Sequence, residues 1–179
     1  MASELHVDAI KHSGGTSAFT IDSSGNVHKA GMVVQTVNFS TNTQVATNTS
    51  TYTDTGLSGA ITPKFASSKI FVTAFQHFRL SGDHDHGVGF KVMRTIGGTA
   101  TAIFTPTTKY EYYFYDGTPN STSDERHDRF PIFVVDSPNT TTACTYTIQY
   151  ASMRTDNTNN IKMQNNSNYS MGHLMEVAQ

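Results

Sequence analysis

Short stretches in which hydrophobic and polar residues alternate recur along the chain. The clearest is residues 144–150, CTYTIQY, in which every second side chain is apolar. Because side chains on a β-strand point alternately to its two faces, this pattern predicts a half-buried strand. No window carries apolar residues at the i, i+3, i+4, i+7 spacing of an amphipathic helix. We therefore expect an all-β protein.

Residues 69–79, KIFVTAFQHFR, depart from simple alternation, because both faces of the predicted strand are apolar. Ile70 and Val72 lie on one face, and Phe71 and Phe75 lie on the other. An antiparallel sheet with one solvated face would carry polar residues on that face. No helix is predicted that could cover the second face. We therefore expect it to pack against another copy of the chain or another protein.

Further strand candidates follow at short, fairly regular intervals, separated by polar turns. Gly97 and Gly98 form a two-residue hairpin signal between two of them. The polar segment 40–50 fits a long loop or an edge strand. This spacing predicts a jelly-roll-like antiparallel β-sandwich. The candidates are 32–39, 51–55, 69–79, 87–95, 99–105, 109–115, 129–135, 144–152, 160–164 and 170–177.

Residues 1–30 are predicted to form a separate N-terminal β arm, with residues 31–179 as the sandwich domain. Leu5, Val7 and Ile10 supply apolar positions in the first short strand of the arm. Strands this short cannot bury a core alone. We expect the arm to anchor or trimerise the protein, held by partner copies or by a host structure, and these three residues are interface candidates.

The composition excludes several classes of protein. Charged residues make up 15% and the formal net charge is −2, which offers no basic surface for nucleic acid or an anionic membrane. No apolar run is long enough to span a bilayer, and no secretion signal is predicted. The one cysteine, Cys144, lies on the apolar face of its strand, so we expect a buried structural thiol.

Asp83, His84, Asp85 and His86 form the one cluster with the residue types of metal ligands. Three copies of one histidine near a threefold axis could close a metal site. No second ligand group lies at a diagnostic spacing, and glycines flank the cluster. We favour a solvated turn and predict no metal site or other cofactor, with His84 and His86 as the weak candidates.

An aromatic strand is predicted at 109–115. Tyr110, Tyr112 and Phe114 share one face, and Tyr113 and Tyr115 share the other. Exposed tyrosines suit sugar rings, because each combines a flat apolar body with a polar tip. The same residues are enriched at protein interfaces and in cores, which is the interpretation we favour.

The densest charge cluster is residues 123–129, SDERHDR. Thr122 and Glu125 have the spacing of a capping box, so one helical turn could form here. Ser, His and Asp side chains occur together, but neighbours along a chain rarely reach the geometry of a catalytic triad. An exposed loop or a polar interface rim fits better. The chain carries no recognisable catalytic motif, so we do not expect an enzyme.

Three segments resemble a broad group of tailed-bacteriophage virion proteins of the cyanophage and marine-phage type, described as tail fibre, head decoration or structural proteins. They are LSGAITPKFASSKIFV (57–72), DSPNTTTACTYTIQYAS (136–152) and GHLMEVAQ (172–179). The arm, residues 4–27, is similar to short N-terminal modules of phage appendage proteins. The resemblance implies a jelly-roll-like sandwich, a homotrimer and a place on the virion surface after assembly in the bacterial cytoplasm.

Two functions follow from these expectations. The first is a non-enzymatic trimeric protein that decorates or cements the capsid, with the major capsid protein, or a tail or adaptor protein, as partner. The second is the receptor-binding knob of a tail fibre, which would bind host glycan through loops 81–87 and 117–128. A metal-dependent hydrolase centred on His84 or His86 is a third, weaker idea. The candidate residues for the trimer seam are Phe71, Phe75, Phe78, Tyr110, Tyr112 and Phe114.

Overall fold

The computed structural model describes residues 6–82, 85–115, 124–155 and 160–179. These residues form an all-β protein with one short 3-10 helix, Asn165–Ser167, and every strand pairing is antiparallel. No helix in the described ranges is long and apolar enough to cross a membrane. The strands are β1 (Ala9–Lys11), β2 (Ser17–Ile21), β3 (Val27–His28), β4 (Val33–Thr41), β5 (Val45–Thr47), β6 (Thr53–Ile61), β7 (Lys69–Gly82), β8 (His86–Ile96), β9 (Thr99–Phe104), β10 (Tyr112–Phe114), β11 (Asp124–Asp136), β12 (Cys144–Ser152), β13 (Asn160–Met163) and β14 (Ser170–Val177).

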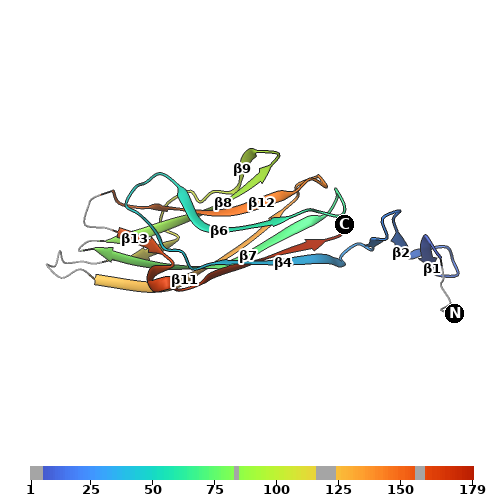
Figure 1. The fold of residues 1–179 in the computed structure, drawn as a ribbon, viewed down its shortest axis with the longest axis horizontal. Coiled ribbons are helices and arrows are strands. Elements are labelled where there is room, and N and C mark those ends of the chain that lie inside the picture. Colours follow the sequence, from blue (N-terminus) through green and yellow to red (C-terminus); the bar gives the residue numbers. More distant parts are fainter. Residues whose placement is uncertain (1–5, 83–84, 116–123, 156–159) are drawn as a thin grey trace.

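Two sheets pack face to face as a sandwich (Figure 1). In the six-stranded sheet, β7 pairs with β11 on one side and with β14 and then β13 on the other, and β4 and β5 continue outward from β14 and β13. In the five-stranded sheet, β6, β12 and β8 are neighbours, and β9 and β10 both pair with β8. If β4–β5, β9–β10 and β13–β14 each count as one interrupted strand, successive strands alternate between the sheets except at β8 and β9–β10, which are neighbours in one sheet. This is the strand order of a jelly roll. The structure confirms the predicted fold class.

The core lies between the sheets and follows the predicted alternation. Cys144, Tyr146, Ile148 and Tyr150 of β12 are all buried. Facing them from the other sheet are the inward residues of β7, which include Ile70, Val72 and Ala74. Phe39 fills the space left by two glycines, since an ideal Cβ would lie 2.5 Å from its ring at Gly59 and 2.2 Å at Gly172.

The N-terminal strands β1, β2 and β3 form a three-stranded sheet of their own, which projects from one end of the sandwich near the C-terminus (Figure 1). Its base is fixed to the last residues of the chain. Gly31 N donates to Ala178 O at 2.8 Å, and a His28 ring nitrogen lies 3.0 Å from Gln179 O. The His28 ring also packs edge-on against Phe65, at 4.8 Å between centroids.

One predicted loop belongs to a strand instead. The charged segment at 124–129 forms the first half of β11 and pairs with β7 from Gly82 to His77. This strand partner overrides the local charge pattern, so the prediction of a loop was wrong here. Of the two residues of the predicted capping box, Glu125 lies in β11 and Thr122 lies outside the described residues. The polar segment 40–50 contains β5, which lies at the edge of its sheet as expected.

Candidate interaction surfaces

The outer face of the six-stranded sheet carries a cluster of exposed apolar side chains, which we call the phenylalanine face. It consists of Phe71, Phe75, Phe133, Val135 and Met171. Phe75 is 55% exposed, Phe133 66% and Met171 47%. The register places these residues together, because Phe71 pairs with Val135 and Phe75 with Met171. Such a cluster marks an interaction surface more often than a bare solvent face.

A groove of about 650 Å³ runs across the same face. Thr73, His173 and Asn38 form one cross-strand row of its lining, and Phe75 and Met171 line it from the next row. Tyr169 also lines the groove. Phe133 stands at the end of this row, because it pairs with Thr73 on the edge strand β11. A projecting ring and a hollow therefore lie side by side on one surface.

The sequence identified only part of this surface. Phe71 and Phe75 point outward as predicted, with Phe71 half-buried beside Phe133 at 6.0 Å between ring centroids. Phe133, Val135 and Met171 were missed. The run FPIFVVD at 130–136 is apolar on both faces, as 69–79 is, and that signal could have identified Phe133 and Val135.

Phe78 is a core residue, so the expectation that it lines a seam was wrong. Its side chain is fully buried and packs on Phe90 and Tyr112, with ring centroids 5.9 and 4.8 Å away. The alternation along β7 shifts near Gln76 and His77, which are also buried, and this shift is not visible in the sequence.

The aromatic segment 109–115 divides differently from the prediction. Only Tyr112–Phe114 form a strand, and Tyr112 and Phe114 are half-buried against the sandwich. Phe114 stacks on His86 and lies under the Arg126 guanidinium, 4.2 Å from the ring centroid. Tyr110 precedes the strand and packs edge-on against Tyr113, at 5.4 Å. Tyr110, Tyr113 and Tyr115 are the exposed members.

The arm presents Ile10, which is 44% exposed, and Val7, which is half-buried. Leu5 lies outside the described residues. Whether Val7 and Ile10 contact another molecule stays a prediction.

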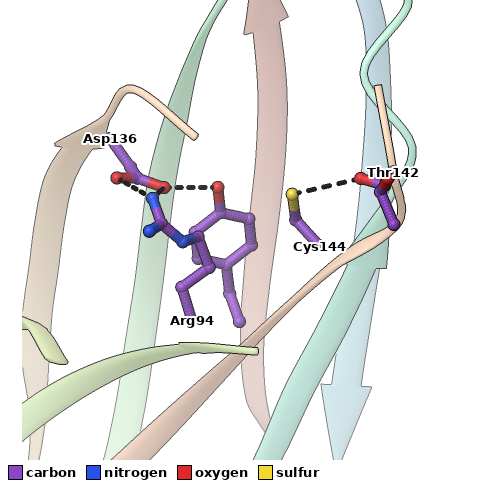
Figure 2. Close-up of polar contacts among 5 residues, drawn as sticks. Arg94, Asp136, Thr142 and Cys144 are labelled. Carbon is purple, nitrogen blue, oxygen red and sulfur yellow. Dashed lines mark hydrogen bonds and ion pairs between the residues drawn. The ribbon is translucent and has the colours of Figure 1, made fainter. Parts of the chain in front are cut away.

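A largely buried polar cluster joins the two sheets (Figure 2). Arg94 of β8 donates from Nη1 to both carboxylate oxygens of Asp136, at 2.8 and 2.9 Å, and the Tyr146 hydroxyl donates to the same carboxylate at 2.8 Å. Burial, and then the hydrogen bond to Asp136, raise the pKa of Tyr146 far above its usual value. Asp136 ends β11, so the cluster holds this edge strand against the opposite sheet.

Cys144 lies in the same region, and its thiol donates to Thr142 O at 3.3 Å (Figure 2). Burial raises its pKa above the ordinary value, which disfavours the reactive thiolate. The structure therefore confirms a buried free thiol.

The predicted chemistry of the 83–86 loop is only partly visible. Asp83 and His84 lie outside the described residues. His86 is buried at the start of β8, so this histidine is not part of a solvated turn. Among the residues that the structure describes, no group of three or more His, Cys, Asp or Glu side chains could hold a metal ion.

Comparisons with known proteins give little further information. No family model matches the chain, and no curated protein matches it. The chain is similar to solved structures from infectious bursal disease virus. The Gx strain structure has a TM-score of 0.35 at 11% identity, covering 96% of this chain and 37% of the other. The T13 viral particle has a TM-score of 0.34 at 10% identity, covering 97% and 40%.

The chain thus spans about two fifths of the length of these viral proteins. With TM-scores below 0.5, the likeness carries no argument about function, which we therefore argue from the surfaces of this chain.

Proposed function

We propose that this protein is a non-enzymatic virion structural protein, a homotrimer that decorates or cements the capsid surface of a tailed phage. The observation that carries the proposal is the phenylalanine face, which no described part of the chain covers. Residues 57–72, 136–152 and 172–179, which resemble phage virion proteins, support the same function.

The occupant of the phenylalanine face that we propose is a second copy of this chain. Phe133 projects beside a groove on the same surface, so the Phe133 ring of one copy can enter the groove of the next. A projecting side chain and a groove on one surface produce a head-to-tail contact between copies. Such contacts form a closed ring when the rotation from one copy to the next returns to the first copy. Three such contacts would each need to bury at least about 1,000 Å² to be stable.

Two kinds of contact are possible at β11: a further strand could pair with its edge, or another copy could pack on the face of the sheet. The edge of β11 favours packing on the face. Among the described strands, β11 pairs only with β7, so its other edge is open. Pro131 lies in the middle of this strand and has no N–H to donate. Proline on an edge strand discourages the addition of a further strand, whereas Phe133 and Val135 on the face remain accessible.

The arm would anchor the trimer to the major capsid protein, or to a tail or adaptor protein, on the virion surface. Its small sheet, with Ile10 exposed, projects beyond the sandwich and is free to enter a second interface.

Light scattering of the purified protein tests the proposal. We expect three times the 19.6 kDa mass of one chain, and a monomer in the double variant Phe75→Ser, Phe133→Ser. Tyr115→Ser is the matched control, because Tyr115 is equally exposed but lies on the other sheet. A stable monomer of the unaltered protein at micromolar concentration would contradict the trimer.

The second candidate is the receptor-binding knob of a tail fibre, which the exposed tyrosines favour. Copy number per virion separates the two functions. Hundreds of copies indicate decoration of the shell, whereas a few tens or fewer indicate a tail appendage.

A further inference from the structure

The second exposed aromatic surface lies on the other sheet and differs in chemistry from the phenylalanine face. It consists of Tyr110, Tyr113 and Tyr115, which are 55%, 43% and 68% exposed. We call these three residues the tyrosine cluster. All three aromatic side chains of this surface carry a hydroxyl group, whereas no side chain of the phenylalanine face does.

The backbone of the five-stranded sheet is shaped to hold this cluster. A Cβ added at Gly87 would lie 3.0 Å from Lys109 O, and one added at Gly89 would lie 3.0 Å from Lys109 Cα. The two glycines therefore let residues 108–110 lie directly on the outer face of β8. This placement brings the Tyr110 ring beside Tyr113, which pairs with Gly87.

A polar network lies next to the rings. The Tyr113 hydroxyl donates to Asp85 Oδ2 at 3.0 Å, and Arg154 donates to the same residue, from Nε to the backbone oxygen at 2.9 Å and from Nη2 to Oδ2 at 3.4 Å. Desolvation, the hydrogen bond to Asp85 and the nearby Tyr110 and Tyr115 hydroxyls raise the pKa of Tyr113. The hydrogen bond to Asp85 also fixes the position of the Tyr113 hydroxyl beside the carboxylate.

The tyrosine cluster lies at the end of the sandwich opposite the arm. β7 starts at Lys69, paired with Val177 close to the arm, and ends at Gly82. With 14 residues at a rise of about 3.3 Å each, it extends for roughly 45 Å. Tyr113 pairs with Gly87 of β8, which lies beside Leu80 and Ser81 at this far end, so the cluster and the arm face different surroundings.

We propose that the tyrosine cluster, with Asp85 and Arg154, is a carbohydrate-binding site for an oligosaccharide of neutral pyranose sugars. The C–H face of a pyranose ring packs on an aromatic ring, and its hydroxyls need donors and acceptors beside that ring. The tyrosines supply the flat surface, Asp85 and the tyrosine hydroxyls accept or donate hydrogen bonds, and the Arg154 guanidinium donates. An apolar protein partner would not need this polar network. The site does not depend on the trimer or on attachment to a capsid.

The test uses the full-length protein on a printed array of bacterial O-antigen and capsule oligosaccharides, with cellohexaose and maltohexaose titrated in solution. We expect binding to at least one of these glycans, weakened at least tenfold by Tyr110→Ala and by Tyr113→Ala. Tyr113→Phe keeps the ring and removes the contact with Asp85, so we expect an intermediate loss. Ile10→Ala is the control, an exposed apolar residue of the arm at the opposite end of the molecule, and should bind normally.

Circular dichroism and light scattering on each variant establish that fold and oligomeric mass are retained. If a cluster variant fails to fold, saturation-transfer NMR on the unaltered protein takes its place, and bound sugar protons should receive magnetisation from tyrosine rings. Binding to none of the glycans overturns the proposal. So does full binding by the folded double variant Tyr110→Ala, Tyr113→Ala, or an equal loss in Ile10→Ala. None of these results alters the mass measurement that tests the trimer.

Discussion

At the scale of single residues, the half-buried Phe39 ring packs directly against two glycines. The ring occupies the space where side chains at Gly59 and Gly172 would lie. Because a close-packed core cannot absorb an extra methyl group without movement, the two glycines are structural requirements of β6 and β14.

We predict that Gly172→Ala lowers the free energy of unfolding by about 1–3 kcal/mol, the usual cost of overpacking a core. An ideal Cβ would lie 2.2 Å from Phe39 Cζ, so the ring must leave its position. Urea unfolding measures the loss. In a double-mutant cycle with Phe39→Leu, the two losses should not add, and strict additivity would contradict the contact. Gly14→Ala, where the nearest atom is 3.3 Å away on an exposed histidine, is the control.

Tyr150 gives a prediction about pH. Its burial in the core raises its pKa from 10.0 to about 12. Between these values the unfolded chain loses the phenol proton while the native chain keeps it, so stability is fully present below pH 10 and falls as the pH rises toward 12. We expect the unaltered protein to lose about 1.4 kcal/mol per pH unit more than Tyr150→Phe over this range. Urea unfolding at pH 9, 10.5 and 11.5 measures this difference, and parallel pH profiles would contradict it.

At the scale of elements, alternation predicted most strands because most of them bury one face only. β12 matches its prediction at both ends, and β7 is placed correctly on both faces as far as Phe75. Partners, however, cannot be derived from local pattern. The charged residues 124–129 form a strand only because β7 continues to Gly82 and pairs with them. Tyr110 contacts Tyr113 only because Gly87 and Gly89 have no side chains, which lets residues 108–110 lie on the outer face of β8.

The arm is an element whose removal should leave the sandwich intact. Every residue of the hydrophobic core cluster lies between Val37 and Leu174. The arm touches the sandwich mainly through His28, beside Phe65 and Gln179.

We predict that a chain starting at residue 31 keeps its β-type circular dichroism spectrum and a single cooperative thermal transition, with the midpoint lowered by no more than a few degrees. A chain starting at residue 42 lacks β4 and should not fold, which makes it the comparison. Loss of the cooperative transition on removing residues 1–30 would show that the arm is part of the folding unit.

At the scale of the whole molecule, the proposed trimer would be held by apolar contact rather than by charge. The phenylalanine face carries no charged residue, and the chain has a formal net charge of only −2. Salt screens interactions between exposed charges but leaves apolar burial in place or strengthens it.

We therefore predict that the mass measured by light scattering is the same in 0.05 M and 1 M sodium chloride. Phe133→Glu should give a monomer at both salt concentrations, because burying an unpaired carboxylate at the contact is costly. Thr101→Glu, at an exposed position on β9 of the other sheet, is the control and should keep the mass of the unaltered protein. A trimer that dissociates in 1 M salt and survives Phe133→Glu would instead be held by the charged half of β11, where Arg79 pairs with Glu125. The seam would then lie at the far end of the sheet and not at Phe75 and Phe133.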